Sequence, residues 1–439
     1  EEQLMLDSKI FTIAEEVVRE DYVVGLYYME TKTEDILKRV EAIALEQSTG
    51  TWVSVPEETE EIREKCVAKV IGVYDIPNYE DAIPEDIKER KVFFLLAFPA
   101  ANLNGQIPQL LTALYGNISM AGKIKLLDVF FPPSFVKNYK GPKFGIEGIR
   151  ELLGVKTRPL LLAMFKPCIG MKPKTLGKLL YELGVGGIDI IKDDELLADP
   201  DFCCVEERLE ECMKACQKVY KDTGRKVLYA LNITDNLDKM MKKAKTAVKN
   251  GANCLMVNTY TVQYSTLSAL AEDPSIKVPL LTHPDFAGAL FGSPYYGLSS
   301  SLVLGKFARL AGSDIVVYPS YFGKVLMVKE RIIRIAQELT SPFYHLKRVF
   351  PVPSAGVHPG LVDLMIKDLG NDLIIGAGGG VHGHPLGVIA GAKAFHQAID
   401  AVQQGVSLKE MAKKKKELKL AIEKWGTSDQ KTNTYTLVK

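Results

Sequence analysis

Residues 186–195 read GGIDIIKDDE, a short apolar run that ends in charged residues. Seven further short runs rich in strand-forming residues lie between residues 159 and 380. The eight runs are PLLLAMFKP at 159–167, GGIDIIKDDE at 186–195, KVLYALNIT at 226–234, ANCLMVNTY at 252–260, VPLLTHPD at 278–285, SDIVVYPS at 313–320, RVFPVPSAG at 348–356 and DLIIGAGGG at 372–380. Most gaps between them, such as 205–224, repeat apolar residues every three or four positions, which predicts helices.

Strands that are apolar throughout and alternate with helices indicate a parallel sheet buried on both faces. Eight such units in about 240 residues predict an α/β fold with a closed (β/α)8 TIM barrel. A doubly wound open sheet is the alternative.

The first 140 residues predict a separate α+β domain. Strand-like runs with one solvated face lie at 21–31, 66–76, 91–100 and 123–132, and helix-like stretches lie at 33–48 and 104–117. We therefore predict an α+β, ferredoxin-like domain over 1–138, the barrel over 139–405 and a helical C-terminal tail over 406–439. The stretch 132–145, with its prolines and glycines, is the expected linker. The basic segment 407–425 is expected to be one amphipathic helix with its charged face in solvent.

Opposite charges are nearly balanced along the 439 residues, with 55 Lys and Arg against 54 Asp and Glu. That balance argues against a nucleic-acid binder or a protein of anionic membrane surfaces. No apolar run reaches the roughly 18 residues that a membrane-spanning helix needs. The acidic start of the sequence does not resemble a signal peptide. Seven cysteines without a CxxC pair favour reduced thiols, so we expect a cytoplasmic protein.

Residues at the C-terminal ends of barrel strands are the first candidates for function. The run at 186–195 ends in Lys192, Asp194 and Glu195, and alternation along a strand puts Lys192 and Asp194 on one face. Two neighbouring carboxylates are hard oxygen ligands suited to Mg²⁺. A lysine of lowered pKa can also react with CO₂ to give a carbamate, a third oxygen ligand. A simple salt bridge is the alternative interpretation.

Three other strand ends carry candidate polar groups. Lys166 follows the first run, and a nearby divalent cation should lower its pKa, so that it could remove a proton next to a carbonyl. A lysine at the rim in solvent is the alternative. His283 is either a capped structural residue or a group near the substrate. Lys324 lies in a loop that is either a mobile lid or ordinary surface.

Glycines mark the ends of the last two runs. Ser354 and Gly356 end the seventh run, and Gly378, Gly379 and Gly380 end the eighth. Many barrels bind phosphate through backbone N–H groups in these two loops, and glycine lets the backbone approach an anion. We predict a phosphate site here, with a flexible turn as the alternative. His382 and His384 have a spacing that permits a metal pair, but no third ligand nearby supports one.

These strand ends, in this order, resemble the Rubisco superfamily. GGIDIIKDDE is similar to the family's metal motif, and FKPCIG at 165–170 is similar to its catalytic lysine motif. EQSTGTW at 46–52 and YGN at 115–117 are similar to active-site segments of its N-terminal domain. The resemblance extends from about residue 22 to residue 425. It implies a homodimer, or a higher oligomer of dimers, in which the N-terminal domain of one subunit completes the barrel site of the other.

The resemblance also implies Mg²⁺ and CO₂ as cofactors, the CO₂ as a carbamate on Lys192. It assigns Lys192, Asp194 and Glu195 to the metal, Lys166 to proton transfer, Asn117 to a place over the metal, His283 and Lys324 to the catalytic set, and Thr51, Ser354, Gly356, Gly378 and Gly379 to the phosphorylated substrate.

The departures from the carboxylating members are informative. Cys168 stands where they have a second lysine, and Pro284 stands where they have an arginine for the distal phosphate. A bisphosphate needs cationic partners at both ends, so CO₂ fixation is not expected. The chain instead resembles Rubisco-like proteins, and PSAGVHPG and GGGVHGHP are closest to the methionine-salvage 2,3-diketo-5-methylthiopentyl-1-phosphate enolases. Those enolases carry a lysine base at the position of Asn117, so the base here would be Lys166.

Metal-assisted enolisation of a phosphorylated ketone is therefore the expected chemistry. The alternatives are an isomerase of a methylthio-pentulose phosphate, a decarboxylase of a 3-oxo sugar-acid phosphate, a true ribulose-bisphosphate carboxylase and a non-catalytic sugar-phosphate binding protein.

Overall fold

The computed structural model describes residues 9–17, 21–32, 35–51, 53, 55–321 and 325–429. Internal contacts group the chain into two compact units. The N-terminal unit comprises Glu1–Tyr139 and Ala287–Val303, and the barrel unit comprises Lys140–Phe286 and Leu304–Lys439. The segment 287–303 therefore belongs with the N-terminal unit, although its sequence lies between two strands of the barrel.

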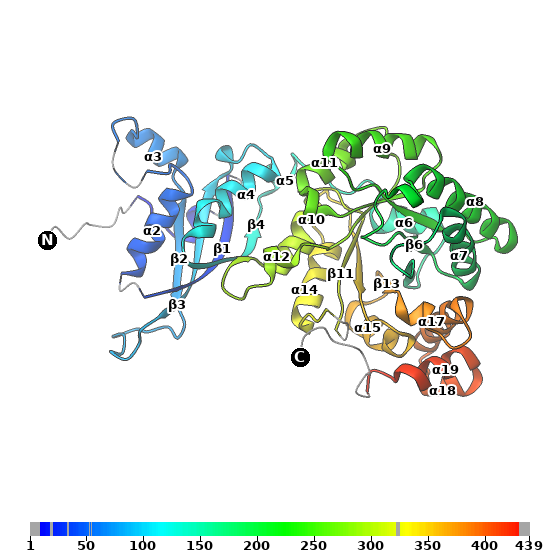
Figure 1. Ribbon diagram of the computed structural model, residues 1–439. Helices are drawn as coiled ribbons and strands as arrows, with labels where there is room; N and C mark the ends of the chain where they lie inside the picture. The colour runs from blue at the N-terminus through cyan, green and yellow to red at the C-terminus, as the bar shows by residue number, and fades with distance from the viewer. Residues whose placement is uncertain are drawn as a thin grey trace. The chain divides into compact units, whose positions relative to one another are not determined.

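The N-terminal unit is an α+β fold, as predicted (Figure 1). Its described sheet has the order β10-β4-β1-β3-β2, in which the pairs β4-β1, β1-β3 and β3-β2 are antiparallel and the short β10 pairs parallel with β4. The order β4-β1-β3-β2 is the ferredoxin-like arrangement. The elements are α1 Ala14–Val17, β1 Tyr22–Thr31, α2 Ile36–Glu46, α3 Glu60–Cys66, β2 Lys69–Asp75, β3 Arg90–Pro99, α4 Ile107–Tyr115, β4 Lys123–Phe130, α5 Pro133–Val136, α12 Gly288–Phe291 and β10 Gly297–Leu298, with 3₁₀ turns at Ala100–Asn102 and Asn117–Met120.

Helices α2 and α4 form because one face of each is apolar. Helix α2 begins after Asp35, whose side chain accepts a hydrogen bond from the Lys38 N–H, and this satisfies one of the unpaired donors of the first turn. Helix α4 buries Leu110 and Leu114. The hydroxyl of Tyr27 on β1 donates to the Leu114 carbonyl oxygen at 2.8 Å, so α4 is tied to the sheet.

The barrel unit contains, in its described residues, a sheet of eight strands in the order β12-β11-β9-β8-β7-β6-β5-β13, and each strand is parallel to its neighbours in this order. Each predicted run contains one strand, so the prediction of a (β/α)8 barrel is confirmed. The strands are β5 Leu160–Met164, β6 Ile190–Lys192, β7 Leu228–Asn232, β8 Cys254–Val257, β9 Leu280–Thr282, β11 Ile315–Pro319, β12 Phe350–Ser354 and β13 Ile374–Ala377.

The first and last strands of that order lie side by side, which brings the barrel near closure. A Cβ added to Gly376 of β13 would lie 3.0 Å from side-chain atoms of Ser354 and Val352 of β12. Glycine at this position therefore lets the two strands approach closely.

Side chains of alternate strand residues fill the barrel interior. Leu160, Leu162 and Met164 of β5 point inward with residues such as Met256 and Val352, and all are buried. This alternation is the two-residue period of a strand. Ile149 of α6 (Gly145–Leu153) belongs to the same cluster, so α6 contributes to the barrel core.

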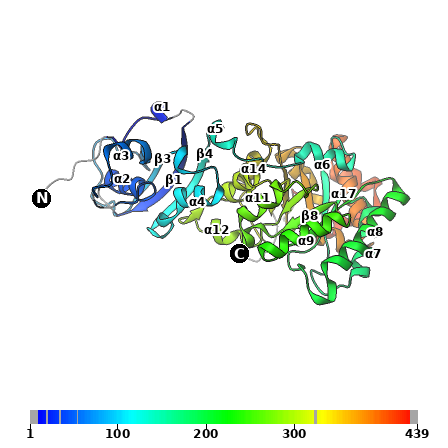
Figure 2. The ribbon, with the colours of Figure 1, turned by 90° about the horizontal axis from the view of Figure 1, so that it is seen from above.

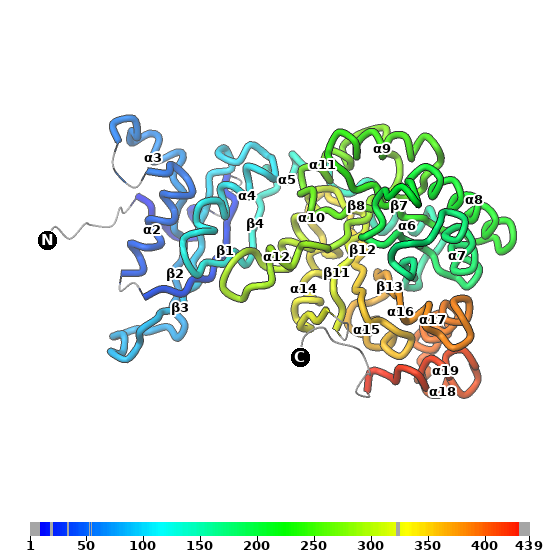
Figure 3. The backbone as a smooth tube through the Cα atoms, in the orientation of Figure 1, coloured from blue at the N-terminus to red at the C-terminus, as the bar shows by residue number. Residues whose placement is uncertain are grey.

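Helices surround the strands, and α7 and α8 lie at the outer edge of this unit in both views (Figures 2 and 3). The helices of this unit are α7 Pro173–Gly186, α8 Val205–Thr223, α9 Leu237–Lys249, α10 Thr259–Val262, α11 Tyr264–Glu272, α13 Phe307–Leu310, α14 Lys329–Thr340, α15 Val362–Leu369, α16 Gly379–His382, α17 Val388–Gln403, α18 Leu408–Lys414 and α19 Lys416–Trp425. In the part of the chain that the structure covers, no helix is long and apolar enough to cross a membrane.

The prediction of a single helix over 407–425 is wrong. Helices α18 and α19 are separated at Lys415, whose φ of −124° and ψ of 107° are not helical. The break lets both short helices pack on α17, with Met411 and Leu418 among the buried residues. The boundary between the two units falls between Tyr139 and Lys140, inside the expected linker 132–145. Phe135 and Tyr139 of this stretch are buried.

Candidate active site

Four charged side chains form two ion pairs where β5 and β6 end. The two strands are neighbours, with Met164 opposite Lys192. Lys166 and Asp194 each lie two residues farther along, and Lys166 Nζ is 2.8 Å from Asp194 Oδ2. Lys192 Nζ is 3.2 Å from Glu195 Oε2. The barrel thus brings the two predicted lysines and the two predicted carboxylates into one cluster.

Asp193, between these residues in sequence, faces the other way. Its carboxylate accepts hydrogen bonds from Arg208 Nε at 3.1 Å, the Tyr229 hydroxyl at 2.6 Å and the Asn232 backbone N–H at 2.8 Å. Asp193 and Arg208 are both fully buried. A buried charge is costly unless it is paired and hydrogen-bonded, and here it is both. Strand alternation therefore separates a structural carboxylate from the two that face the lysines.

His283, at the end of β9, joins the cluster through Glu195. The backbone N–H of Asp285 donates to His283 Nδ1 at 3.3 Å, so Nδ1 carries a lone pair. Burial, and next the charge of Lys192, lower the pKa of His283 below its usual range. Nε2 of the ring lies 3.2 Å from Glu195 Oε2.

The surroundings of Lys166 stabilise its ammonium form. Burial alone would lower the pKa of Lys166, but hydrogen bonds to Asp194 and Cys168 outweigh burial and raise that pKa above its usual value. Cys168 Sγ lies 2.9 Å from Lys166 Nζ. The sequence predicts a lowered pKa for Lys166 beside a divalent cation. In this structure the nearest charge is the Asp194 carboxylate, so the pKa of Lys166 is raised instead.

The two carboxylates of the cluster could hold Mg²⁺ only together with a third ligand. Asp194 and Glu195 offer oxygen ligands, which Mg²⁺ prefers. Across the described ranges, no three His, Cys, Asp or Glu side chains are placed to hold a metal ion together. A carbamate on Lys192, whose Nζ already lies beside Glu195, would supply the missing oxygen ligand. The residues present therefore suit a site built on a modified lysine.

The glycine-rich loop after β13 lies beside Lys166. A Cβ added to Gly378 would lie 2.5 Å from Met164 Sδ and 3.3 Å from Lys166 Cε, so glycine leaves room here chiefly for Met164 and keeps the loop close to Lys166. A Cβ on Gly379 would meet no described atom within 4 Å, which leaves the space there open. A Cβ on Gly380 would be 2.2 Å from the Val357 carbonyl oxygen, so the loops after β12 and β13 pack directly on each other.

The loop after β12 turns sharply at two left-handed residues. Ala355 has φ +71° and Gly356 has φ +77°. The hydroxyl of Ser320 donates to the Ala355 carbonyl oxygen at 2.8 Å and holds the turn. Ser354, just before the turn, is buried. Ser354, Gly356, Gly378 and Gly379, the barrel residues predicted to bind phosphate, thus lie in two packed loops next to Lys166.

Asn232 and Asn258 lie at the ends of the third and fourth predicted strands, and neither was among the predicted site residues. Asn258 Nδ2 donates to the Glu195 carbonyl oxygen at 3.0 Å, and Asn232 Nδ2 lies 3.4 Å from the carbonyl oxygens of Asp194 and Glu195. Asn258 Oδ1 is buried without a hydrogen-bond partner among the described residues. Their position at strand ends was the available signal.

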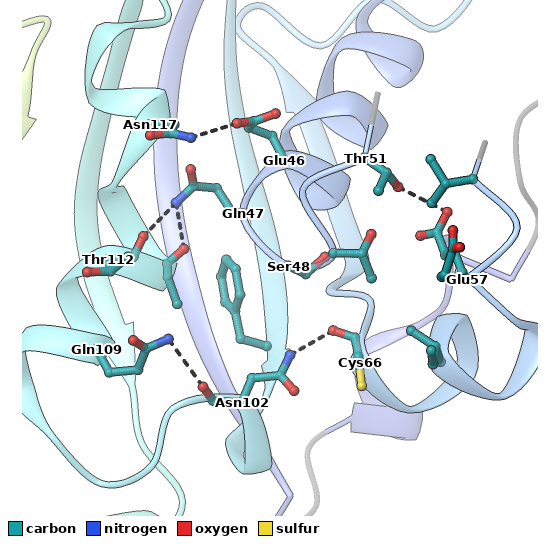
Figure 4. Close-up of a pocket in the computed structure, with 16 residues that line it drawn as sticks. Glu46, Gln47, Ser48, Thr51, Glu57, Cys66, Asn102, Gln109, Thr112 and Asn117 are labelled. Carbon is teal, nitrogen blue, oxygen red and sulfur yellow. Dashed lines mark hydrogen bonds between the residues drawn. The ribbon is translucent and has the colours of Figure 1, made fainter. Parts of the chain in front are cut away.

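Thr51 and Asn117 line a cavity of about 630 Å³ within the N-terminal unit (Figure 4). Asn117 Nδ2 donates to Glu46 Oε1 at 2.8 Å, and Thr51 Oγ1 donates to Glu58 Oε2 at 3.0 Å. The lining residues include Glu46, Glu57 and Glu58 but, among those described, no lysine or arginine. The cavity alone therefore lacks the cations that a phosphate needs.

Lys324 lies outside the described residues, and so does Trp52 of the EQSTGTW segment.

The family model for the ribulose bisphosphate carboxylase large chain catalytic domain matches residues 145–425, and that for its N-terminal domain matches residues 13–135. A ribulose bisphosphate carboxylase-like protein of Archaeoglobus fulgidus is 50% identical over 88% of this chain and 89% of its own length. A 2,3-diketo-5-methylthiopentyl-1-phosphate enolase of Geobacillus thermodenitrificans is 40% identical over 91% of this chain and 97% of its own.

Solved structures agree with these matches. A Rubisco-like protein of Alicyclobacillus acidocaldarius has a TM-score of 0.85 at 38% identity, covering 92% of this chain and all of the other. A dimeric archaeal Rubisco of Hyperthermus butylicus has a TM-score of 0.84 at 31% identity, covering 95% and 99%. The resemblance stated from the strand ends is confirmed, and the chain belongs to the family of the ribulose bisphosphate carboxylase large chain.

Proposed function

We propose that this protein is a Rubisco-like enolase that acts on a phosphorylated ketone, with 2,3-diketo-5-methylthiopentyl-1-phosphate as its substrate. One observation carries the proposal: a lysine suited to proton transfer lies between the carboxylates of the metal motif and the open glycine loop. Lys166 Nζ lies 2.8 Å from Asp194 Oδ2, and Lys166 Cε lies 3.3 Å from the position that a Cβ on Gly378 would take. The relatives named as enolases of this diketo phosphate support the choice of substrate.

Each group in the barrel has a role in this proposal. The backbone at Gly356, Gly378 and Gly379 binds the phosphate, since no side chain blocks its approach there. Lys166 removes the proton next to the ketone. Asp194, Glu195 and a carbamate on Lys192 would hold Mg²⁺, which would polarise the ketone. Asp194 would then be a metal ligand, and a nearby divalent charge would lower the pKa of Lys166 toward the value that a base needs.

The residues around the site also favour an enolase over a carboxylase. Cys168 lies where carboxylating members carry a second lysine. After His283 the chain continues with Pro284 and Asp285, and the Asp285 carboxylate oxygen lies 3.4 Å from the imidazole Nδ1. A second phosphate near His283 would meet that negative charge with no arginine to offset it. A substrate with one phosphate suits the site better.

Proton exchange tests the proposed function. The protein is incubated with Mg²⁺, bicarbonate and the diketo phosphate in D₂O, and deuterium uptake and enol formation are followed by NMR and ultraviolet absorbance. We expect both, and we expect no 3-phosphoglycerate from radiolabelled CO₂ with ribulose bisphosphate. Carboxylation at a Rubisco-like rate, or no exchange with the diketo phosphate, would reject the proposal. Testing the other phosphorylated ketones and ketoacids in the same assay would identify an alternative substrate.

Lys192 is expected to carry a carbamate when CO₂ and Mg²⁺ are supplied. Its Nζ lies beside Glu195, and the carbamate replaces a buried ammonium by an anionic oxygen ligand. Chemical trapping followed by mass spectrometry should show the added carboxyl group on Lys192 and not on Lys306, a buried lysine far along the chain used as the control. Mg²⁺ binding with an unmodified Lys192 would contradict the prediction.

The resemblance implies, and we propose, that the functional unit is at least a dimer in which Asn117 of one subunit serves the barrel of the other. A mixture of Lys166→Ala and Asn117→Ala subunits should then regain activity, because a mixed dimer contains one intact site. Random pairing predicts recovery of about a quarter of the native sites. The measurement is exchange activity after the two impaired variants are co-expressed and purified, compared with each variant alone. No recovery, in mixed dimers verified by differential tags, would contradict a shared site.

A further inference from the structure

Gln47, just after the end of α2, makes three hydrogen bonds to the segment that presents Asn117. Figure 4 draws the bond from Gln47 to the Thr112 carbonyl oxygen. Its Nε2 donates to the Ala113 carbonyl oxygen at 2.7 Å and to the Thr112 carbonyl oxygen at 3.1 Å. Its Oε1 accepts the Ile118 backbone N–H at 3.2 Å. The side chain is 7% exposed and spans two consecutive elements, α4 and the 3₁₀ turn Asn117–Met120.

Two of these bonds satisfy groups that a helix end otherwise leaves without partners, the Ala113 carbonyl oxygen and the Ile118 N–H. The Thr112 carbonyl oxygen also accepts from the Gly116 N–H at 3.0 Å. The last carbonyls of a helix have no partner within it, and the first N–H groups of the next turn also lack one. The chain turns tightly between the two elements at Gly116, where a Cβ would lie 2.4 Å from the Thr112 carbonyl oxygen. A primary amide matches this place because it donates twice and accepts at once.

Asn117 itself is exposed, so burial does not hold its side chain. It lies between Gly116 and Ile118, and its Nδ2 donates to Glu46, the neighbour of Gln47, at 2.8 Å. Two adjacent residues of α2 therefore hold two adjacent residues of the turn: Glu46 holds the Asn117 side chain, and Gln47 holds the backbone at Ile118.

We propose that Gln47 is a positioning residue that fixes Asn117 for its role in enolisation. This inference rests on the proposed function, because it gives Asn117 a place in the reaction. Gln47 does not touch the substrate in this proposal. It fixes the position of the Asn117 amide instead. One N–H of that amide donates to Glu46, so its second N–H and its carbonyl oxygen are available to the ligand.

Two substitutions remove the bonds in different ways. Gln47→Leu keeps similar volume and removes every hydrogen bond of the side chain. Gln47→Glu keeps the acceptor for Ile118 but sets a carboxylate oxygen against the Thr112 and Ala113 carbonyl oxygens. Gln109→Leu is the matched control, since Gln109 lines the same cavity and its Nε2 contacts the Asn102 carbonyl oxygen at 3.5 Å.

The experiment compares these variants, alone and combined with Asn117→Ala, in the exchange assay. Displacing a group by about 1 Å costs up to about 100-fold in rate, so we expect Gln47→Leu and Gln47→Glu to lower kcat about 10- to 100-fold with KM nearly unchanged. In the Asn117→Ala background, neither should lower kcat further, because residues that act through each other are not additive. Gln109→Leu should behave like the native protein.

A second measurement does not depend on activity. Hydrogen exchange of the peptide that contains Ile118 should be faster in both Gln47 variants than in Gln109→Leu, while the barrel peptides exchange as in the native protein. A native kcat in the Gln47 variants would contradict the inference about Gln47 and leave the proposed function standing. The same holds if the losses in kcat from the Gln47 and Asn117 substitutions multiply in the double variants. If Asn117→Ala by itself leaves exchange unchanged, the role of Asn117 in the proposed function fails, and the inference fails with it.

Discussion

Lys166→Ala is expected to abolish proton exchange between the diketo phosphate and solvent. Loss of a general acid–base group typically costs about 10²- to 10⁴-fold in rate. Lys166 Nζ is the amine placed between Asp194 and the Gly378 loop, so no other lysine described in the structure takes its place there. The measurement is the rate of deuterium incorporation at saturating substrate.

The control is Lys166→Arg, which keeps the positive charge beside Asp194 but does not release a proton near neutral pH. It should retain the fold and lose exchange as fully as the alanine variant. Substrate binding, followed by calorimetry, should persist in the arginine variant. Near-normal exchange in Lys166→Ala would mean that the base lies elsewhere, and His283 and Lys324 would be tested next.

Arg208→Met is expected to destabilise the barrel unit strongly. Arg208 donates to Asp193 at 3.1 Å and to the Cys203 and Ala198 carbonyl oxygens, each at 2.6 Å, and both charged side chains are fully buried. Removing one partner leaves a buried carboxylate without its counter-charge, which typically costs about 3–5 kcal/mol. Urea denaturation should show a lower midpoint at an unchanged slope.

Two controls separate the buried pair from charge in general. Lys214→Met, in an exposed pair with Glu210, should leave the midpoint within error, because surface pairs contribute little. Arg208→Met combined with Asp193→Asn should be more stable than Arg208→Met alone, since the unpaired charge is then gone. An Arg208→Met midpoint equal to that of the native protein would show that the pair contributes nothing to stability.

The fold was readable from the sequence because its strongest signals are local. Each of the eight apolar runs contains one strand, and the helices at 205–224 and 237–252 follow the period of apolar residues. The arrangement of Lys192, Asp193 and Asp194 also follows from strand alternation alone, and the contacts of Asp193 agree with it. Glycines at strand ends pointed to the two loops that pack beside Lys166.

Other features depended on contacts between residues far apart in the chain. The pairing of Gly297–Leu298 with β4 joins a segment from the middle of the barrel sequence to the N-terminal sheet, and two residues carry too little pattern to predict it. The break at Lys415 depends on packing against α17, not on local helix preference. Asn258, with its buried unpartnered oxygen, became a candidate only when the structure put it beside Glu195.

The sequence by itself determined the α+β domain, the eight-stranded barrel and the identity of the groups at the strand ends, because strand and helix periods and glycine positions are properties of neighbouring residues. The tertiary structure alone decided which of those groups pair. Lys166 faces Asp194 because β5 and β6 are in register at Met164 and Lys192, and that contact sets the direction of its pKa. Gln47 reaches Ile118 across 71 residues of sequence for the same reason: hydrogen bonds and charges act over a few ångströms of space, whatever the distance along the chain.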